Sequence, residues 1–239
     1  MSEAAVSDSA KPTRTGPKWE ADAQERLRKA IRKFARPLAD LVARDANEGD
    51  TRLLVTDFLC EGLGFDKFEH LTTEYAVKGE FADYGIRIDK QLVAFIEVKR
   101  TTTKLSDKHL RQVEMYAVNE GVEWMILTNG GHWQAYHLSP GMPVEIDLAL
   151  DVNLLTDGTV PHKAQTLFYL TLESLKRRQI DDLWKAKRAT SPKSLARVVC
   201  TEPVLEVVRR ELRRATGHNV ETAELGRLLK ETVIKPDCF

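Results

Sequence analysis

Apolar residues recur at steps of three and four in the first part of the chain, over residues 21–46. This spacing predicts an amphipathic helix, because it places the apolar side chains on one face. Pro37 lies within the pattern, and we expect it to kink the helix or to start a second segment. After a polar break, with Asp50 as a candidate N-cap, a second helix is predicted over residues 53–63.

The pattern changes to that of strands from residue 81 onward. Residues 81–88 and 92–99 are rich in Ile, Val and Phe and flank a short polar turn, which predicts an antiparallel hairpin. A helix is predicted from Ser106 to about residue 119. Further strands are predicted at residues 124–128, 132–138 and 144–150. A helix between two strands is a crossover connection, so we expect an α/β fold, a restriction-endonuclease-like mixed central sheet flanked by helices.

The last third of the chain carries helical patterns only. A long helix is predicted over residues 164–188, and a Ser-Pro linker follows it. Three short helices are predicted at residues 195–199, 204–216 and 222–232. We therefore divide the chain into a flexible polar tail (1–18), an α/β domain (19–188) and a small helical module (189–239).

Charge is balanced over the whole chain but not along it. The 239 residues include 36 basic and 36 acidic side chains, which excludes a strongly basic, histone-like protein. Residues 51–170 carry an acidic excess and residues 171–239 a basic one. This segregation fits a cation-binding site beside a polyanion-binding surface, and it fits ordinary solvated faces equally well.

Several classes of protein are excluded by what the sequence lacks. No apolar run approaches the roughly 20 residues that cross a membrane, and the N-terminal residues show no apolar signal segment. The three cysteines are far apart, so neither a zinc site nor a disulfide framework is indicated. No phosphate-binding loop motif is present either. We expect a cytoplasmic protein with reduced thiols and no membrane partner.

Three charged residues at the predicted hairpin carry the candidate chemistry. Glu97 and Lys99 are two residues apart on one strand and therefore share a face. A three-residue turn would place Asp83 opposite Glu97 on the neighbouring strand, with Cβ atoms about 5 Å apart. A two-residue turn shifts the register by one and requires a bulge near Asp83 to restore that pairing. Either geometry brings two carboxylates and one ammonium group together.

Two adjacent carboxylates repel each other unless one is protonated or a cation lies between them. Mg²⁺, or Mn²⁺ in its place, takes oxygen ligands, so Asp83, Glu97 and the backbone carbonyl of Val98 could hold one. Lys99 beside that cation would have a lowered pKa and could orient or deprotonate the water that attacks a phosphodiester. The same residues also fit a surface salt bridge. They end an apolar strand, however, where buried charges are costly unless they serve a site.

Asp83 and the run Glu97-Val98-Lys99 resemble the PD-(D/E)xK nuclease superfamily. More narrowly, the sequence is similar to the N-terminal nuclease domain of type I restriction enzyme motor subunits. Further matching segments are residues 62–66, 73–75, 112–116 and 126–130. The resemblance covers about residues 48–140. The sequence departs from the family at Ala82, where the superfamily motif has Pro, and it lacks the helicase motor.

The resemblance implies a Mg²⁺- or Mn²⁺-dependent endonuclease that cleaves DNA, in restriction or in defence against foreign DNA. It implies that Asp83 and Glu97 bind the metal and that Lys99 is the catalytic lysine. It also implies that Gln112 and Tyr116 lie near the site and contact the nucleic acid or support the lysine and metal. Because the motor is missing, cleavage coupled to translocation would need a partner subunit. A homodimer would allow both strands to be cut.

Two interpretations, one functional and one structural, remain open for each of several other charged residues. Glu48 and Glu74 are either additional acidic metal ligands or solvated residues. Five basic residues after the strand either contact DNA phosphates or form a solvated face: Arg100, Lys104, Lys108, His109 and Arg111. Four arginines between residues 209 and 214 either pair with neighbouring glutamates or bind phosphates.

The alternative function is a non-catalytic nucleic-acid-binding or assembly subunit that keeps the nuclease fold. The absent motor and the basic C-terminal module favour this alternative. The presence of all three of Asp83, Glu97 and Lys99 favours an enzyme. RNA is not excluded as the substrate, because the same chemistry cleaves it and nothing in the sequence distinguishes a 2′-hydroxyl.

Overall fold

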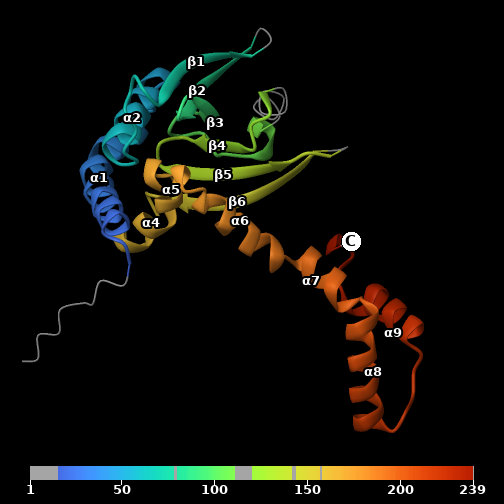
Figure 1. The fold of residues 1–239 in the computed structure, drawn as a ribbon. Coiled ribbons are helices and arrows are strands. Elements are labelled where there is room, and N and C mark those ends of the chain that lie inside the picture. The colour runs from blue at the N-terminus through green and yellow to red at the C-terminus, as the bar shows by residue number, and fades with distance from the viewer. Residues whose placement is uncertain (1–15, 78–79, 111–119, 142–143, 157, 239) are drawn as a thin grey trace, which may run out of the picture. The chain divides into compact units, whose positions relative to one another are not determined.

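The computed structural model describes residues 16–77, 80–110, 120–141, 144–156 and 158–238 (Figure 1). The chain forms two compact units, the first ending at Ile180 and the second beginning at Asp181. Most of the predicted tail, residues 1–18, lies outside the described residues. The predicted boundary between the α/β domain and the helical module, at residue 189, stays a prediction.

Two helices open the first unit. Helix α1 (Lys18–Ala43) buries one apolar face, which includes Leu27, Phe34 and Leu38. It continues through Pro37, so the expectation that this residue starts a second segment is wrong. Helix α2 (Glu48–Glu61) begins earlier than predicted.

The N-cap of α2 is Asn47, not Asp50. The Asn47 side chain accepts a hydrogen bond from the backbone N–H of Asp50, at 2.8 Å. Asn is as good an N-cap as Asp, and starting the helix at residue 48 adds almost a full turn. That extra turn carries Glu48 and places it in the first turn of the helix.

A six-stranded mixed sheet forms the centre of this unit (Figure 1). Its strands are β1 (Leu71–Val77), β2 (Glu80–Ile88), β3 (Gln91–Val98), β4 (Trp124–Thr128), β5 (His132–Ser139) and β6 (Glu145–Asn153). They follow chain order, and only β3 and β4 pair in parallel. A parallel pair needs a crossover connection, as predicted, but most of the predicted crossover helix lies outside the described residues. The α/β fold class is confirmed.

Both faces of the central strands are buried. In β3 every residue from Ala94 to Val98 is buried, as expected for a strand covered on two sides. Helices α1 and α2 lie along one side of the sheet (Figure 1), where the rings of Phe58 and Trp133 are 5.4 Å apart. A separate cluster joins Phe95 to residues of the segment after β3, among them Leu105. Trp133 is thus a core residue.

The β2–β3 hairpin has a two-residue turn, and a bulge corrects its register. Ile88 pairs with Gln91, and the two turn residues, Asp89 and Lys90, have positive φ angles of 50° and 67°. The register then shifts between Ile86 and Arg87, and from there to the strand end the pairing is that of the three-residue alternative. The bulge lies farther from Asp83 than predicted, but it restores the position of Asp83 opposite Glu97.

The predicted long helix over residues 164–188 is wrong, because three shorter helices cover this segment. These are α4 (Val160–Leu167), α5 (Leu172–Lys176) and α6 (Gln179–Ala189), with a 3₁₀ turn (Phe168–Leu170) after α4. Thr171 breaks the helical run: its backbone is extended, and its hydroxyl caps α5 by accepting from the Ser174 N–H. The backbone N–H of Leu172 donates instead to the carbonyl of Leu63, after α2.

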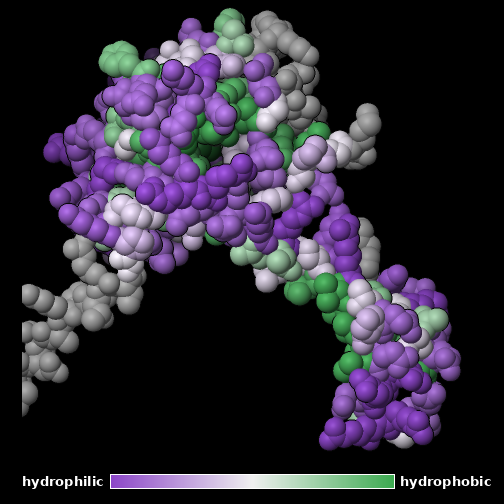
Figure 2. Space-filling model, viewed as in Figure 1, coloured by the Kyte–Doolittle hydropathy of each residue, from purple (hydrophilic) through white to green (hydrophobic). Residues whose placement is uncertain are grey.

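The second unit is helical beyond α6. It contains α7 (Pro192–Val199), α8 (Glu202–Thr216) and α9 (Thr222–Leu228), which continues into a π-helical turn (Leu229–Val233), and a 3₁₀ turn (Pro236–Cys238). Leu205 of α8 and Leu225 of α9 are buried in its small core. Leu195 and Val198 of α7 are half exposed, and Figure 2 shows hydrophobic surface over this helix. None of the helices described in either unit is long and apolar enough to cross a membrane.

Candidate active site

The three residues predicted to carry the chemistry meet where β2 and β3 lie side by side. Asp83 is in β2, Glu97 is in β3, and Lys99 follows β3 directly. The Lys99 Nζ atom lies 2.5 Å from Oε1 of Glu97, so these two side chains point the same way, as predicted. Asp83 Oδ2 accepts a hydrogen bond from the backbone N–H of Val98, at 2.7 Å. That bond ties Asp83 to the strand segment between Glu97 and Lys99.

The end of the neighbouring strand holds Lys99 in place. The Lys99 N–H donates to the carbonyl of Thr128 at 2.8 Å, which extends the parallel pairing of β3 and β4 past the strand end. Asn129 then fixes the loop that follows Lys99, because its amide donates to the carbonyls of Thr101 and Thr103. The same side chain accepts from the N–H of His132, at 2.7 Å. One asparagine therefore joins the site loop to the β4–β5 turn.

Glu97 is a buried carboxylate with one satisfied oxygen. The residue is 5 % exposed, and burial raises its pKa, with the Lys99 hydrogen bond opposing that shift. The charges of Asp83 and Glu48 raise the pKa further. Its second oxygen, Oε2, is buried and has no hydrogen-bond partner among the described residues. A buried, unpartnered carboxylate oxygen is costly unless a cation or a donor binds it.

Lys99 carries a raised pKa despite its burial. Burial alone would lower it, but the hydrogen bond and charge of Glu97 outweigh that effect, and Glu48 and Asp83 add to it. With these protein groups alone as its neighbours, Lys99 is a cation. The expected fall in its pKa depends on a metal ion and stays a prediction.

Arg52 is a site residue that the sequence reasoning missed. It extends from α2, and its Nη1 atom donates to Oδ1 of Asp83 at 3.0 Å and lies 3.9 Å from Oε1 of Glu74. Its backbone carbonyl accepts from the Tyr84 hydroxyl at 3.0 Å, which fixes the helix against β2. The sequence held one signal for it, since Arg52 lies one helical turn after Glu48 on the same helix face.

The two extra acidic candidates differ in how they relate to this centre. Glu48 is close enough to influence the pKa values of Glu97, Lys99 and His109. Glu74, in contrast, is exposed and reaches the centre through Arg52. Whether either one binds a metal stays a prediction. His109 is one of the basic residues predicted to contact phosphates, and burial together with the charge of Lys99 lowers its pKa.

The predicted phosphate-binding residues differ in their surroundings. Arg100 forms an ion pair with Asp45 at 2.8 Å, and its guanidinium also donates to the Asp45 carbonyl. It thereby braces the loop between α1 and α2. Lys104 and Lys108 are exposed. Arg111 lies outside the described residues, as do Gln112 and Tyr116.

The arginines of α8 partly follow the pairing alternative. Arg209 pairs with Glu206 at 2.8 Å, and Arg214 pairs with Glu211 at 3.4 Å, each with the glutamate three residues before it. Half of the four predicted phosphate contacts therefore already have a carboxylate neighbour on their own helix.

The residues present fit a divalent cation with few protein ligands. Within the described ranges, no group of three or more His, Cys, Asp or Glu side chains is arranged to hold a metal. Mg²⁺ commonly needs only one or two carboxylates, because it retains several waters. Asp83 and Glu97 meet that requirement, and the buried, unpartnered Oε2 of Glu97 is an oxygen that such an ion would satisfy.

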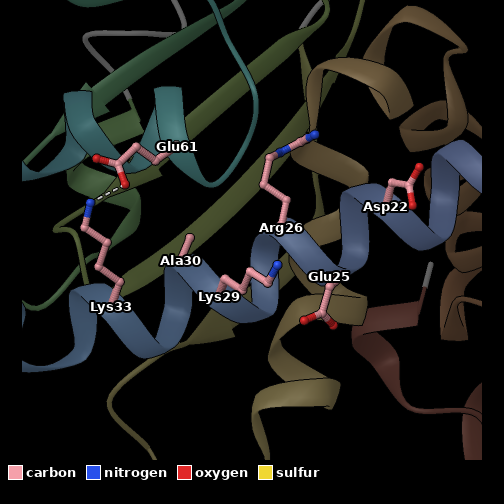
Figure 3. A pocket seen from close by; sticks show the side chains of 7 residues that line it. All are labelled: Asp22, Glu25, Arg26, Lys29, Ala30, Lys33 and Glu61. Atoms are coloured by element: carbon pink, nitrogen blue, oxygen red, sulfur yellow. Dashed lines mark hydrogen bonds and ion pairs between the residues drawn. The ribbon is translucent and has the colours of Figure 1, made fainter.

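A separate hollow of about 520 Å³ lies along α1 (Figure 3). Its lining residues are Asp22, Glu25, Arg26, Lys29, Ala30, Lys33 and Glu61. Figure 3 shows the ion pair between Lys33 and Glu61 that spans from α1 to α2. None of the candidate site residues lines this hollow, and its ion pairs connect helices. We therefore assign it no binding role.

The comparison with protein families agrees with this geometry. Residues 47–146 match the family model of the type I restriction enzyme R protein N terminus (HSDR_N). Residues 47–146 form an HSDR_N domain. This domain is of the PD-(D/E)xK nuclease type, so the resemblance deduced from the sequence is confirmed. No curated protein and no solved structure matches the chain.

The HSDR_N domain covers less than half of the 239 residues. It begins at the N-cap of α2 and ends at the start of β6, so it includes Glu48, Arg52, Asp83, Glu97 and Lys99. Helix α1 and the second unit lie outside it. The family match thus spans the residues of the candidate site and leaves the C-terminal helices unassigned.

Proposed function

We propose that the HSDR_N domain of this chain is a Mg²⁺- or Mn²⁺-dependent DNA endonuclease that acts in restriction or in defence against foreign DNA. The observation that carries this proposal is the convergence of Asp83, Glu97 and Lys99, with one buried oxygen of Glu97 left unpartnered. A purely structural ion pair would have both carboxylate oxygens satisfied or exposed to water.

Each residue has a distinct role in this proposal. Asp83 and Glu97 hold the cation, together with the carbonyl of Val98, and Glu48 is a further acidic candidate. When bound, the cation stabilises the negative charge that develops on the phosphodiester. Lys99 is held by Glu97 and donates to the attacking water or to the phosphate oxygen. Gln112 and Tyr116 are proposed to contact the substrate near the lysine.

The substrate is proposed to be DNA because the matched family belongs to restriction enzymes. Lys104, on the loop after Lys99, and Lys108, in a 3₁₀ turn (Asp107–His109), are both exposed. We propose that they bind backbone phosphates along with Arg111. Arg100 is proposed to contribute too, although in the structure it braces the Asp45 loop. The proposed partners are a restriction-complex subunit, as the matched family suggests, or a second copy of the chain.

Metal binding and cleavage, measured together, test this proposal. Wild-type protein should bind Mn²⁺ and cleave plasmid DNA only when a divalent cation is present. Asp83→Asn should lose both, because a neutral amide is a poor ligand for a hard cation. The matched control is Asp57→Asn, an exposed residue of α2, which should behave like wild type.

A non-catalytic nucleic-acid-binding subunit is the second candidate. One observation favours it: both central carboxylates already have a protein cation beside them, Arg52 on Asp83 and Lys99 on Glu97. Such a subunit would bind DNA with steep salt dependence, and Mn²⁺ would change neither its affinity nor its stability.

A further inference from the structure

Arg52 is shared between two carboxylates that differ greatly in exposure. Its Nη1 atom is 3.0 Å from Oδ1 of Asp83, whose side chain is 11 % exposed. The same atom is 3.9 Å from Oε1 of Glu74, whose side chain is 71 % exposed. The guanidinium therefore already lies within reach of a second, solvated acceptor.

The backbone at Glu74 brings this second acceptor to the site. Glu74 has a φ angle of 49°, which is rare for any residue other than glycine. The β1–β2 pairing is regular on both sides of it, with Thr73 opposite Tyr84 and Tyr75 opposite Ala82. Glu74 thus lies across from Asp83, with a left-handed backbone conformation inside strand β1. Strained backbone of this kind persists where surrounding structure and function favour it.

A divalent cation at Asp83 conflicts with the observed position of Arg52. Asp83 Oδ2 is engaged by the Val98 N–H, so Oδ1 is the oxygen most available to a metal. A guanidinium 3.0 Å from Oδ1 would repel that metal strongly, since the site is largely shielded from water. Arg52 and the cation therefore compete for the same oxygen.

The helix backbone is fixed, so only the Arg52 side chain can resolve this conflict. The Arg52 carbonyl accepts hydrogen bonds from the Tyr84 and Thr56 hydroxyls, at 3.0 and 2.8 Å. A change of rotamer that moves the guanidinium from Asp83 toward Glu74 leaves these bonds intact. It also keeps the arginine paired.

We propose that Arg52 is a positioning residue that takes the place of the cation at Asp83, and that Glu74 accepts its guanidinium when a divalent cation binds. This inference rests on the proposed metal-dependent function. It assigns Glu74 an indirect role: Glu74 assists metal binding through Arg52 and is not a ligand.

Mn²⁺ binding to the full chain without DNA tests the inference, with free Mn²⁺ followed by electron paramagnetic resonance. Arg52→Gln should bind Mn²⁺ on the order of tenfold more tightly than wild type, because the competing charge is gone. Glu74→Gln should bind it several-fold more weakly. In the double variant the Glu74 effect should vanish, because Glu74 acts only through Arg52.

The double variant distinguishes this relay, in which Glu74 acts on the metal only through Arg52, from a direct effect of the Glu74 charge on the metal. If Glu74 acted on the metal directly, as a ligand or through its charge, its removal would weaken binding equally with and without Arg52. That additive result would overturn the inference, and so would weaker Mn²⁺ binding by Arg52→Gln. Arg36→Gln, which removes an exposed arginine from α1, is the control and should leave affinity unchanged.

Two controls are needed before the Mn²⁺ affinities can be interpreted: the variants must fold, and the wild type must bind Mn²⁺. Circular dichroism and melting in EDTA should show that Arg52→Gln folds. Glu74 is exposed, so Glu74→Gln is expected to fold in any case, and unchanged Mn²⁺ affinity in that variant alone would overturn the inference. Absence of Mn²⁺ binding by wild type and by every variant would instead refute the proposed function. Binding by wild type with unaltered affinities in the variants would refute only the relay.

Discussion

At the scale of single residues, the site is defined by a buried charge that lacks one partner. Glu97 donates nothing and accepts one bond, from Lys99, while its Oε2 atom has no donor among the described residues. Burial raises its pKa, so the protein environment by itself disfavours the ionised form. A bound cation would reverse that preference, which makes Glu97 a direct probe of metal binding.

Replacing Glu97 by Gln should separate the effect of this carboxylate on the stability of the metal-free protein from its effect on metal binding. In EDTA the variant should melt at or above the wild-type temperature, because it no longer buries an under-satisfied charge. With excess Mn²⁺, the wild type should gain melting temperature through binding to the folded state, and Glu97→Gln should not. Differential scanning calorimetry measures both. An equal Mn²⁺-induced gain in the two proteins would show that Glu97 is not a ligand.

The sequence predicted the meeting of Asp83, Glu97 and Lys99, but it did not predict the residues around them. The spacing of Glu97 and Lys99 on a strand, and the register of Asp83, follow from local geometry, and all three meet in the structure. Arg52 was missed because its contact with Asp83 depends on how α2 packs on β2, whereas its spacing from Glu48 indicates only a shared helix face. The left-handed backbone of Glu74 was equally invisible, since nothing in its identity favours that conformation.

At the scale of elements, the turn and the bulge of the β2–β3 hairpin together determine the position of Asp83 relative to Glu97. Sequence spacing allowed a three-residue turn, or a two-residue turn with a bulge. The structure has the second, with Asp89 and Lys90 both at positive φ, as in a type I′ turn. The bulge then compensates for the short turn and keeps Asp83 level with Glu97.

Lys90→Gly should stabilise this hairpin. Glycine adopts the positive φ of 67° at this position without steric cost, so the free energy of unfolding should rise by about 0.5–1 kcal/mol. Lys90→Ala is the control, since it removes the side chain but keeps the Cβ atom, and it should give no gain. Urea unfolding measures both. A loss of stability in Lys90→Gly would contradict the two-residue turn.

An ion pair joins helix α1 to helix α5. Arg26 of α1 donates to both carboxylate oxygens of Glu173 in α5, at 2.8 and 2.7 Å. It also donates to the carbonyls of Gly62 and Leu63 after α2. This network explains why the predicted long helix breaks. Helix periodicity could not reveal that Thr171 caps a new helix whose first residue bonds to Leu63.

Stability should depend on this pair in a defined pH range. Burial raises the pKa of Glu173, but its bonds to Arg26 outweigh that and lower it below the ordinary 4.5. A lowered folded-state pKa means that the stabilisation is present above pH 4.5 and is lost as pH falls through the folded value. Arg26→Met should therefore cost about 2 kcal/mol at pH 7 and progressively less below pH 4.5.

The control for that measurement is Arg28→Met, which removes a surface pair with Glu25. Its effect on the free energy of unfolding should be about 0–1 kcal/mol. Denaturant unfolding at a series of pH values gives both curves. A constant difference between wild type and Arg26→Met from pH 7 down to acid would show that Glu173 is not the partner that titrates.

At the scale of the whole molecule, the chain combines an HSDR_N domain with elements outside the family match. The acidic excess of residues 51–170 includes Glu74, Asp83 and Glu97, which lie near Arg52 and Lys99. The basic C-terminal helices are less informative, because two arginines of α8 pair with glutamates of the same helix. The nuclease proposal therefore depends on the first unit.

Cleavage of supercoiled plasmid under single-turnover conditions, with Mg²⁺, Mn²⁺ or EDTA, tests that proposal most directly. Wild type and Lys29→Ala, which removes an exposed lysine from α1, should nick the plasmid at equal rates when metal is present. Lys99→Ala should be slower by about 100-fold or more, as expected when a positioned donor is removed. Cleavage by Lys99→Ala at the wild-type rate, or no cleavage by wild type with any metal, would contradict the account.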